Sequence, residues 1–217
     1  MTTLQSQLAD YQSAFKQRVP AERVATMERA TADLRASGIE TRALAIGAAL
    51  PDVVLADVHG ATVRLRDIQG DTPLVVVFYR GGWCPYCNLE LREWQRLLPG
   101  LKDLGARLVA ISPQLPDNSL STAEKNALAY PLLSDSSLAA AHAFGLAFTL
   151  APELVALYSS VGNDLPTLNG NGQWVLPLPA TYVFDGQGAV IYRHVEADYR
   201  LRAEPQQVLD LLAQARA

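Results

Sequence analysis

The stretch LVVVFYRGGWCPYC, residues 74–87, sets the expected fold and chemistry of this chain. Its first six residues form an unbroken apolar run rich in β-branched side chains, which is typical of a central strand covered on both faces. Residues 85–98 then repeat apolar side chains at helical spacing and are followed by Pro99-Gly100, which predicts the end of that helix. Residues 107–111 form the next buried run. This order of strand, helix and strand predicts a parallel pair, and therefore an α/β fold.

Outward from this stretch, the chain divides into a helical arm and a larger α/β unit. Apolar residues recur at steps of three and four over residues 4–18, and a second helix is expected between Pro20 and Gly38. We therefore assign residues 1–42 to an N-terminal helical arm and residues 43–217 to the main domain. The further elements expected are hairpins over residues 53–65 and 181–194, a short strand over 132–133, and helices over 118–129, 137–144, 153–158 and 204–215. The glycine- and proline-rich segment 145–179 otherwise predicts an unusually long loop.

Composition and charge exclude several classes of protein. The 217 residues are 49% hydrophobic and 18% charged, with a formal net charge of −4, which is typical of a folded globular chain. No run of lysine and arginine occurs, so nucleic acid is not an expected partner. No apolar segment is long enough to span a membrane, and the N-terminus lacks the pattern of a secretory signal. We therefore expect no membrane partner and a cytoplasmic location.

The only two cysteines, Cys84 and Cys87, place the expected chemistry at one site. Cys84 lies at the predicted start of a helix, where unpaired N–H groups and the helix dipole favour a thiolate. Pro85 suits the first helical turn because it has no N–H to leave unpaired. Cys87 begins the buried stripe of the same helix. The spacing therefore predicts Cys84 as an exposed nucleophile and Cys87 as the slower, buried partner.

Three other interpretations of the cysteine pair compete with redox chemistry. A structural disulfide is disfavoured, because the cytoplasm keeps thiols reduced and so short a loop gains little stability from closure. A metal site needs about four ligands, and His59, His142 and His194 stand singly in the sequence, so no metal is expected. Inert buried thiols are the third interpretation. A dithiol pair between a buried strand and a helix favours thiol-disulfide exchange over all three.

The residues around the cysteines resemble a known family. Trp83-Cys84-Pro85-Tyr86-Cys87 after a buried strand is similar to the active site of the thioredoxin superfamily, with a box like that of glutaredoxins. Residues 46–52, 67–68, 178–188 and 198–205 resemble the peroxiredoxin-like branch, the alkyl hydroperoxide reductase and thiol-specific antioxidant family. The resemblance covers about residues 43–215. It implies a thioredoxin-like fold, with a central mixed sheet flanked by helices, to which the helical arm is an N-terminal extension.

The resemblance also implies roles for residues near the thiols. Pro179 matches the cis-proline that faces the cysteines in thioredoxin-like proteins, and Trp83 and Tyr86 flank the nucleophile at the expected docking surface. Two features of peroxiredoxins are missing here: Gly81 replaces the hydroxyl residue three positions before the cysteine, and Pro179 replaces an arginine. Arg80 offers a positive charge in compensation, although a solvated charge at a strand end is an equal alternative.

The expected function is that of a thiol-disulfide oxidoreductase. Cys84 would attack a peroxide oxygen or a disulfide sulfur, Cys87 would resolve the product as an internal disulfide, and thioredoxin or glutathione would reduce it again. No metal or organic cofactor is implied. The alternative is a non-catalytic redox sensor or interaction module, whose arm binds a partner or a second copy of the chain as a homodimer. No nearby acid lies in the strand before the site, so the sequence names no base for Cys87.

Overall fold

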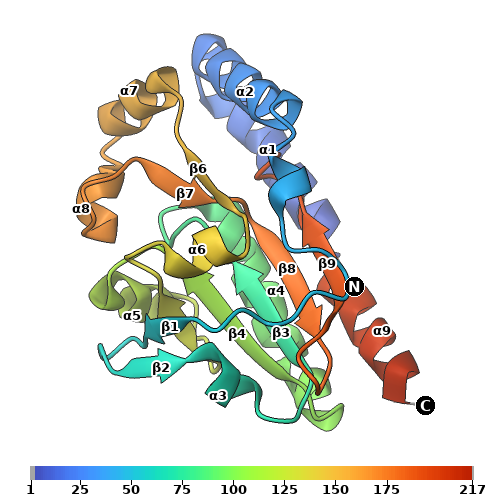
Figure 1. Cartoon of the computed structure of the whole chain (residues 1–217). Coiled ribbons are helices and arrows are strands. Elements are labelled where there is room, and N and C mark those ends of the chain that lie inside the picture. The colour runs from blue at the N-terminus through green and yellow to red at the C-terminus, as the bar shows by residue number, and fades with distance from the viewer. Residues whose placement is uncertain (1–2, 217) are drawn as a thin grey trace.

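A mixed β-sheet forms the centre of the computed structural model, which describes residues 3–216 (Figure 1). Within those residues the sheet has seven strands in the order β2-β1-β5-β4-β3-β8-β9. β3, β4 and β5 are parallel to one another, and the flanking strands pair antiparallel. The strands are β1 Val54–Ala56, β2 Thr62–Arg64, β3 Leu74–Phe78, β4 Arg107–Ser112, β5 Leu132–Ser134, β8 Ala180–Phe184 and β9 Val190–Val195.

The strand before the cysteines is central and buried on both faces, as its apolar run predicts. β3 lies between β4 and β8, and all five of its residues are buried. Because side chains alternate along a strand, Val75 and Val77 pack into one core with Trp94, whereas Val76 and Phe78 pack into a second core on the opposite face. The two cores hold β3 in place, and its C-terminal end carries the cysteine loop.

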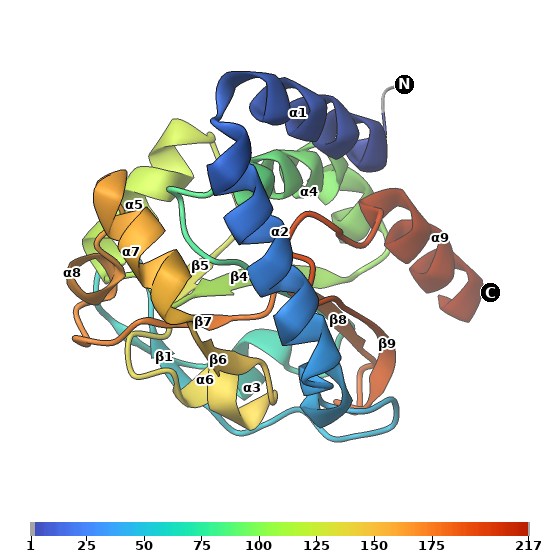
Figure 2. The ribbon, with the colours of Figure 1, turned by 90° about the horizontal axis from the view of Figure 1, so that it is seen from above.

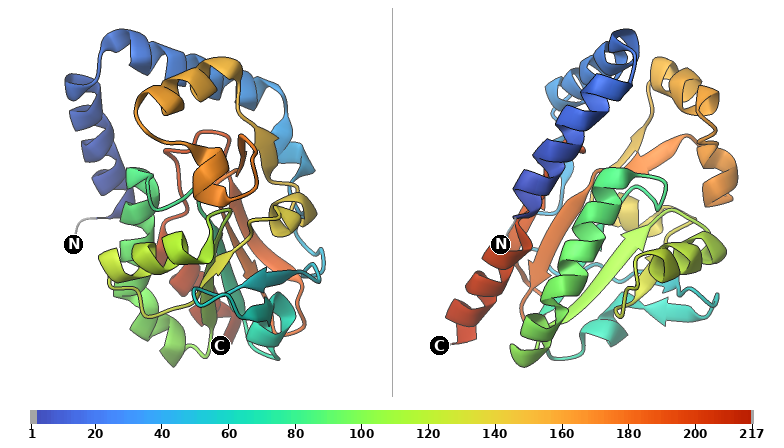
Figure 3. Two further views of the ribbon diagram at one scale, coloured as in Figure 1. Left: turned by 90° about the vertical axis from the view of Figure 1, so that its left-hand side faces the viewer. Right: turned by 180° about the vertical axis from the view of Figure 1, so that it is seen from behind.

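Helices cover both faces of the sheet (Figures 1 and 3). They are α3 Leu65–Gln69, α4 Pro85–Asp103, α5 Pro116–Lys125, α6 Ala139–Ala143, α7 Pro152–Ser160, α8 Leu165–Asn169 and α9 Pro205–Arg216. The expected end of α4 at Pro99-Gly100 is wrong, since the helix continues through Pro99 to Asp103. Proline removes one helical hydrogen bond, but the following turn buries Leu101 completely, and Gly100 lets Leu209 of α9 approach closely.

The segment between residues 145 and 179 is more ordered than its glycine and proline content predicts. β6 Ala147–Thr149 and β7 Val175–Pro177 form a separate antiparallel pair, and α7 and α8 lie between them in sequence. Leu150, Tyr158, Leu165 and Leu176 form a small core of their own. Strands of three residues are too short to show a hydrophobic period, and the expectation of a long loop was therefore wrong.

The N-terminal arm lies across the end of the sheet that carries the cysteines (Figures 2 and 3). It consists of α1 Leu4–Arg18, α2 Ala21–Ala36 and the short 3-10 helix η1 Ile39–Arg42. α1 packs on α4, and α2 packs on α7. Leu4 and Leu8 are buried in the core, and the Glu204 carboxylate accepts hydrogen bonds from the first backbone N–H groups of α1. The helical extension is confirmed, and the domain boundary at residues 42 and 43 stays a proposal.

Candidate active site

The loop between β3 and α4 holds Cys84 at the helix start through two glycines. Cys84 is the N-cap residue of α4 and has an extended backbone. Gly81 has a φ of +147°, and a Cβ there would lie 2.3 Å from the Trp83 indole nitrogen. The Gly82 N–H donates to the Gln114 side-chain oxygen at 2.7 Å. Gly81 therefore allows a close approach of Trp83 that no other residue permits.

The two thiols are free and face different surroundings. The Cys87 sulfur is fully buried and accepts hydrogen bonds from the Arg80 backbone N–H at 3.4 Å and from the Arg202 guanidinium at 3.6 Å. Cys84 lies one turn earlier, at the positive end of the helix dipole. The arrangement places both sulfur atoms beside arginine side chains.

These surroundings shift the two thiol pKa values in opposite directions. Burial by itself would raise the pKa of Cys84, but a hydrogen bond with Cys87 and the charges of Arg80 and Arg202 outweigh it and lower the pKa to about 6. Burial and the neighbouring Cys84 raise the pKa of Cys87 well above its usual value. Since the thiolate is the nucleophilic form, Cys84 is the better candidate for the nucleophile of the pair.

Cys84 is buried, which corrects the expectation of an exposed nucleophile. Only 2% of its surface is exposed. Segments from both ends of the chain pack beside it: the Tyr11 ring of α1 meets the Tyr86 ring edge-on at 5.0 Å, and Tyr199 meets Tyr86 at 5.6 Å. Tyr11 and Tyr199 also line the pocket at Cys84. Helical periodicity within α4 identifies its buried stripe, but it carries no information about which distant segments pack over the helix start.

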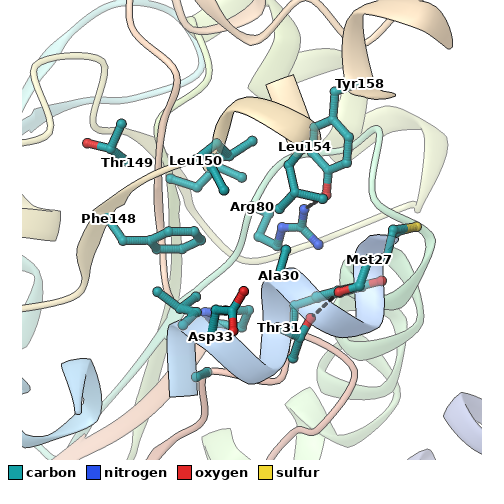
Figure 4. Close-up of a pocket in the computed structure, with 16 residues that line it drawn as sticks. Met27, Ala30, Thr31, Asp33, Arg80, Phe148, Thr149, Leu150, Leu154 and Tyr158 are labelled. Carbon is teal, nitrogen blue, oxygen red and sulfur yellow. Dashed lines mark hydrogen bonds between the residues drawn. The ribbon is translucent and has the colours of Figure 1, made fainter. Parts of the chain in front are cut away.

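Arg80 is enclosed by aromatic rings instead of lying in solvent. Its side chain is 4% exposed, and its guanidinium lies 4.3 Å from the Tyr199 ring centre and 4.9 Å from that of Trp83. It also donates a hydrogen bond to the Tyr158 hydroxyl (Figure 4). The alternative of a solvated charge is wrong, and Arg80 instead places a desolvated cation beside Cys84.

A buried ion pair, which the sequence did not predict, lies behind Cys87. Arg202 Nε lies 2.7 Å from Glu90 Oε2, and the two side chains are 1% and 0% exposed. Burial raises the pKa of Glu90 to about 7, although the charge of Arg202 opposes this shift. One signal in the sequence pointed to this pair: Glu90 follows Cys87 by three residues and so falls on the same face of the helix.

The expected cis bond before Pro179 is absent. The structure contains no cis peptide bond among residues 3–216. The chain leaves β7 at Leu178, whose N–H donates to the Leu146 carbonyl, and enters the β-sheet again in β8 at Ala180. Pro179 therefore does not lie in a tight turn that would favour the less stable cis isomer. Pro179 lines a cavity of about 150 Å³ together with Arg80, Tyr158 and Tyr199, and it is not among the residues that line the pocket at Cys84.

A neighbouring pocket of about 270 Å³, which shares Arg80, Tyr158 and Tyr199 with that cavity, opens on Cys84, and we call it the thiol pocket. The arm lines one side, α7 and the residues after it line another, and the cysteine loop forms the floor. The lining residues are Tyr11, Phe15, Val19, Arg23, Met27, Arg80, Trp83, Cys84, Pro85, Tyr86, Leu157, Tyr158, Val161, Asn163 and Tyr199. Trp83, Pro85, Tyr86 and Arg80 therefore come together with Cys84 as expected, whereas Pro179 does not. In the described part of the chain, no group of three or more histidine, cysteine or acidic side chains could hold a metal ion.

Comparison with known proteins places the chain in a family. Residues 46–193 match the AhpC/TSA family, and the chain belongs to that family. A thiol-disulfide oxidoreductase, ResA of Geobacillus thermodenitrificans, is 31% identical over 108 residues, which are 49% of this chain and 61% of that protein. Peroxiredoxin Bcp of Bacillus subtilis is 31% identical over 99 residues, which are 46% of this chain and 62% of that protein.

A solved structure agrees on the fold. The peroxidoxin BcpB of Mycobacterium tuberculosis superposes with a TM-score of 0.63 at 23% identity, over 79% of this chain and 98% of that one. At that identity the likeness concerns the fold alone, and it confirms the expected thioredoxin-like architecture. None of the helices described here is long and apolar enough to cross a bilayer.

Proposed function

We propose that this protein is a thiol-dependent peroxidase that uses Cys84 and Cys87 as its redox pair. The observation that carries the proposal is the state of Cys84: its pKa is lowered, it lies beside the desolvated Arg80 cation, and a pocket of small-molecule size reaches it. A thiolate is the form that attacks a peroxide, and a nearby cation stabilises the negative charge that develops on the peroxide oxygens. Trp83, Pro85 and Tyr86 form the floor around the nucleophile.

The burial of Cys84 favours a small oxidant over a folded protein disulfide. A protein substrate would have to bring its own sulfur against a residue that is only 2% exposed, in a pocket that the arm helps to line. Reduction of disulfides remains the second candidate, because one of the relatives is named a thiol-disulfide oxidoreductase. Thioredoxin or glutathione is the proposed reductant, the cytoplasm is the proposed location, and formation of a homodimer stays a prediction. The redox sensor is the weaker alternative.

Turnover tests the proposal. The full-length protein would be supplied with a peroxide and with either a thioredoxin or a glutathione system, and NADPH consumption would be followed at steady state. Sustained consumption that Cys84→Ser abolishes is the expected result. A single round of oxidation without turnover would instead favour the redox sensor, and turnover with a disulfide substrate alone would favour the second candidate.

A further inference from the structure

The cavity of about 150 Å³ that Pro179 helps to line takes no part in the redox chemistry described above, and we call it the arm cavity. Ala30 of α2, Phe148 of β6 and Leu154 of α7 contribute to its walls. Figure 4 shows these side chains gathered around the guanidinium of Arg80. The cysteine loop contributes no residue beyond Arg80 to the lining. The arm therefore encloses a second space, which borders the thiol pocket without including the nucleophile.

Arg80 brings to this cavity a cation that lacks a carboxylate partner. Its Nε atom is buried and has no hydrogen-bond partner among the described residues, and none of the ion pairs between those residues includes Arg80. A buried N–H without an acceptor is unfavourable, so this position calls for an oxygen atom. The Tyr158 hydroxyl accepts a hydrogen bond from Arg80, and its own O–H can donate to a second oxygen. These two donors match the two oxygens of a carboxylate.

The remaining walls favour a ligand whose body is apolar and small. Asp33 and Thr149 are exposed, so they lie at the rim, and the Thr31 hydroxyl already donates to the Met27 carbonyl. Most other lining residues are aliphatic or aromatic. A phosphate or sulfate would bring further oxygens that such walls cannot hydrogen-bond. An apolar cavity of ~150 Å³ is large enough for a benzene ring, which limits the body to about one ring.

We propose that the arm cavity binds a small monocarboxylate with a single apolar ring, and that the bound carboxylate competes with the Cys84 thiolate for Arg80. Arg80 lines both the arm cavity and the thiol pocket, so one cation faces both anions. Oxidation of Cys84 removes the thiolate charge, and the carboxylate then binds more tightly. Because coupling between two sites is reciprocal, the carboxylate in turn disfavours the thiolate. The ligand is thus a regulator of the redox pair and not its substrate.

The groups beside Arg80 leave the Cys84 thiolate as the competing anion at neutral pH. The charge of Arg80 helps to lower the pKa of Cys84. Cys87, Tyr158 and Tyr199 also lie near the guanidinium. Burial raises the pKa of each of these three groups, so they stay neutral where Cys84 is ionised. A carboxylate at Arg80 therefore acts on the protonation of Cys84.

Binding is tested with benzoate and with benzamide, its neutral counterpart. Each compound would be titrated calorimetrically at neutral pH into the full-length protein, in the disulfide form and in the reduced form. Benzoate is expected to bind the disulfide form about tenfold more tightly than benzamide does, and several-fold more tightly than it binds the reduced form. Absence of saturable benzoate binding, or equal binding of benzamide, would overturn the inference.

Three variants assign the bound benzoate to one of the two pockets. Ala30→Leu fills part of the arm cavity, and Ala25→Leu adds the same side chain to an exposed position of the same helix as a control. Val19→Phe narrows the thiol pocket instead. Ala30→Leu should weaken benzoate binding by about tenfold or more, because an overfilled cavity excludes the ring, whereas the other two variants should not. Weakening by Val19→Phe alone would place benzoate in the thiol pocket and contradict the proposal.

A crystal structure of the disulfide form with benzoate locates the ligand even if Ala30→Leu does not fold. The ring is expected beside Ala30 and Phe148, with a carboxylate oxygen within hydrogen-bond distance of Arg80 Nε. Benzoate found elsewhere in the molecule, with the arm cavity empty, would reject the site.

The coupling to Cys84 is measured by alkylation, without any peroxide. Saturating benzoate should slow the labelling of Cys84 by iodoacetamide near pH 6 by about threefold or more, because it withdraws Arg80 from the thiolate. Benzamide should not slow it, and Ala30→Leu should remove the effect of benzoate. Unchanged labelling while benzoate is bound would disprove the competition. Since no step uses a peroxide, failure of the proposed peroxidase function would leave these results standing, and the reverse also holds.

Discussion

The two sulfur atoms differ in their surroundings although only three positions separate them along the chain. Cys84 lies at the N-cap of α4 beside Arg80, and its pKa is lowered to about 6, while burial and Cys84 raise the pKa of Cys87. A group with a lowered pKa is ionised at lower pH, so Cys84 is the thiolate at neutral pH. Our proposal that Cys84 attacks and Cys87 resolves rests on this difference.

Alkylation is expected to select Cys84. In reduced protein, the rate of labelling by iodoacetamide at Cys84 should rise as the pH passes through about 6 and then level off, whereas Cys87 stays unlabelled over that range. Mass spectrometry of peptides after a brief reaction measures both sites. Cys87→Ser should trap a mixed disulfide with a small disulfide reagent, and Cys84→Ser should not. Preferential labelling of Cys87 would reverse the two roles.

Removing the charge at position 80 is expected to deactivate the thiolate. Arg80→Met keeps much of the side-chain volume but loses the cation that helps to lower the pKa of Cys84. The pKa should move up toward that of a free cysteine, and peroxide oxidation at neutral pH should slow by about tenfold or more. Stopped-flow oxidation, followed by tryptophan fluorescence, is the measurement.

Two comparisons distinguish a loss of thiolate stabilisation from misfolding of the Arg80→Met variant. Arg66→Met removes a charge from an exposed position and should leave the rate unchanged. A pH profile of the Arg80→Met protein should show the rate rising at higher pH than in the wild type, which a merely misfolded site would not do. An unchanged profile would show that Arg80 does not stabilise the thiolate.

The arm and α4 form one unit at the cysteine end of the sheet. Leu4 and Leu8 of α1 are buried in the core. The Tyr11 ring packs on the ring of Tyr86, which lies between the two cysteines in the sequence. Glu204, just before α9, links the beginning of α1 to that helix by hydrogen bonds, because two backbone N–H groups of the arm donate to its carboxylate. Because α1 also lines the pocket at Cys84, we expect the access of reagents to this thiol to depend on the packing of α1.

Loosening α1 is expected to expose Cys84. Leu8→Ala removes a side chain that is 3% exposed and should cost about 2 to 5 kcal/mol of packing free energy, concentrated where the arm meets α4. The rate of Cys84 labelling by a bulky maleimide should then rise several-fold. Labelling would be timed at a temperature where circular dichroism shows every variant folded.

A matched variant separates local opening from general loss of stability. Leu65→Ala removes another buried leucine, from the core on the other face of the sheet, which contains no residue of α1. It should lower the free energy of unfolding by a similar amount and leave the labelling rate of Cys84 close to that of the wild type. Equal acceleration in both variants would mean that the arm does not control access to the thiol.

The buried charges link the stability of the complete fold to pH. Glu90 has a pKa raised from 4.5 to about 7 by burial, so the folded state holds its proton more tightly than the unfolded state. Glu90 should therefore lower the free energy of unfolding as the pH rises from about 4.5 to about 7, because the unfolded state loses this proton at lower pH than the folded state. Arg202 remains charged throughout and opposes part of the effect.

Glu90→Gln is expected to flatten this pH dependence. Because the amide cannot ionise, the decline in stability between about pH 4.5 and about pH 7 should be smaller in the variant, even though Arg202 loses its ion-pair partner and absolute stability drops. Urea unfolding at several pH values measures the slope, and Glu124→Gln, at an exposed position, is the control. A slope identical to that of the wild type would exclude Glu90 as the titrating group.

The local sequence predicted the parts of the fold that depend on neighbours along the chain. The apolar run of residues 74–79 identified the buried central strand, and the spacing of three and four identified α1 and the cysteine helix. Pro85 marked the helix start. These features follow from the backbone period and the hydrophobic pattern within one segment, so they can be read without knowing the rest of the fold.

Tertiary structure alone decided what surrounds the sulfur atoms. Arg80 is enclosed by rings from α7 and the C-terminal segment, Glu90 pairs with Arg202 112 positions away, and the arm lines the pocket at Cys84. The isomer at Pro179 was likewise set by the strand ladder that it enters. Contacts between distant segments depend on how the helices and the sheet pack together. The hydrophobic periodicity of a single element therefore cannot predict these contacts.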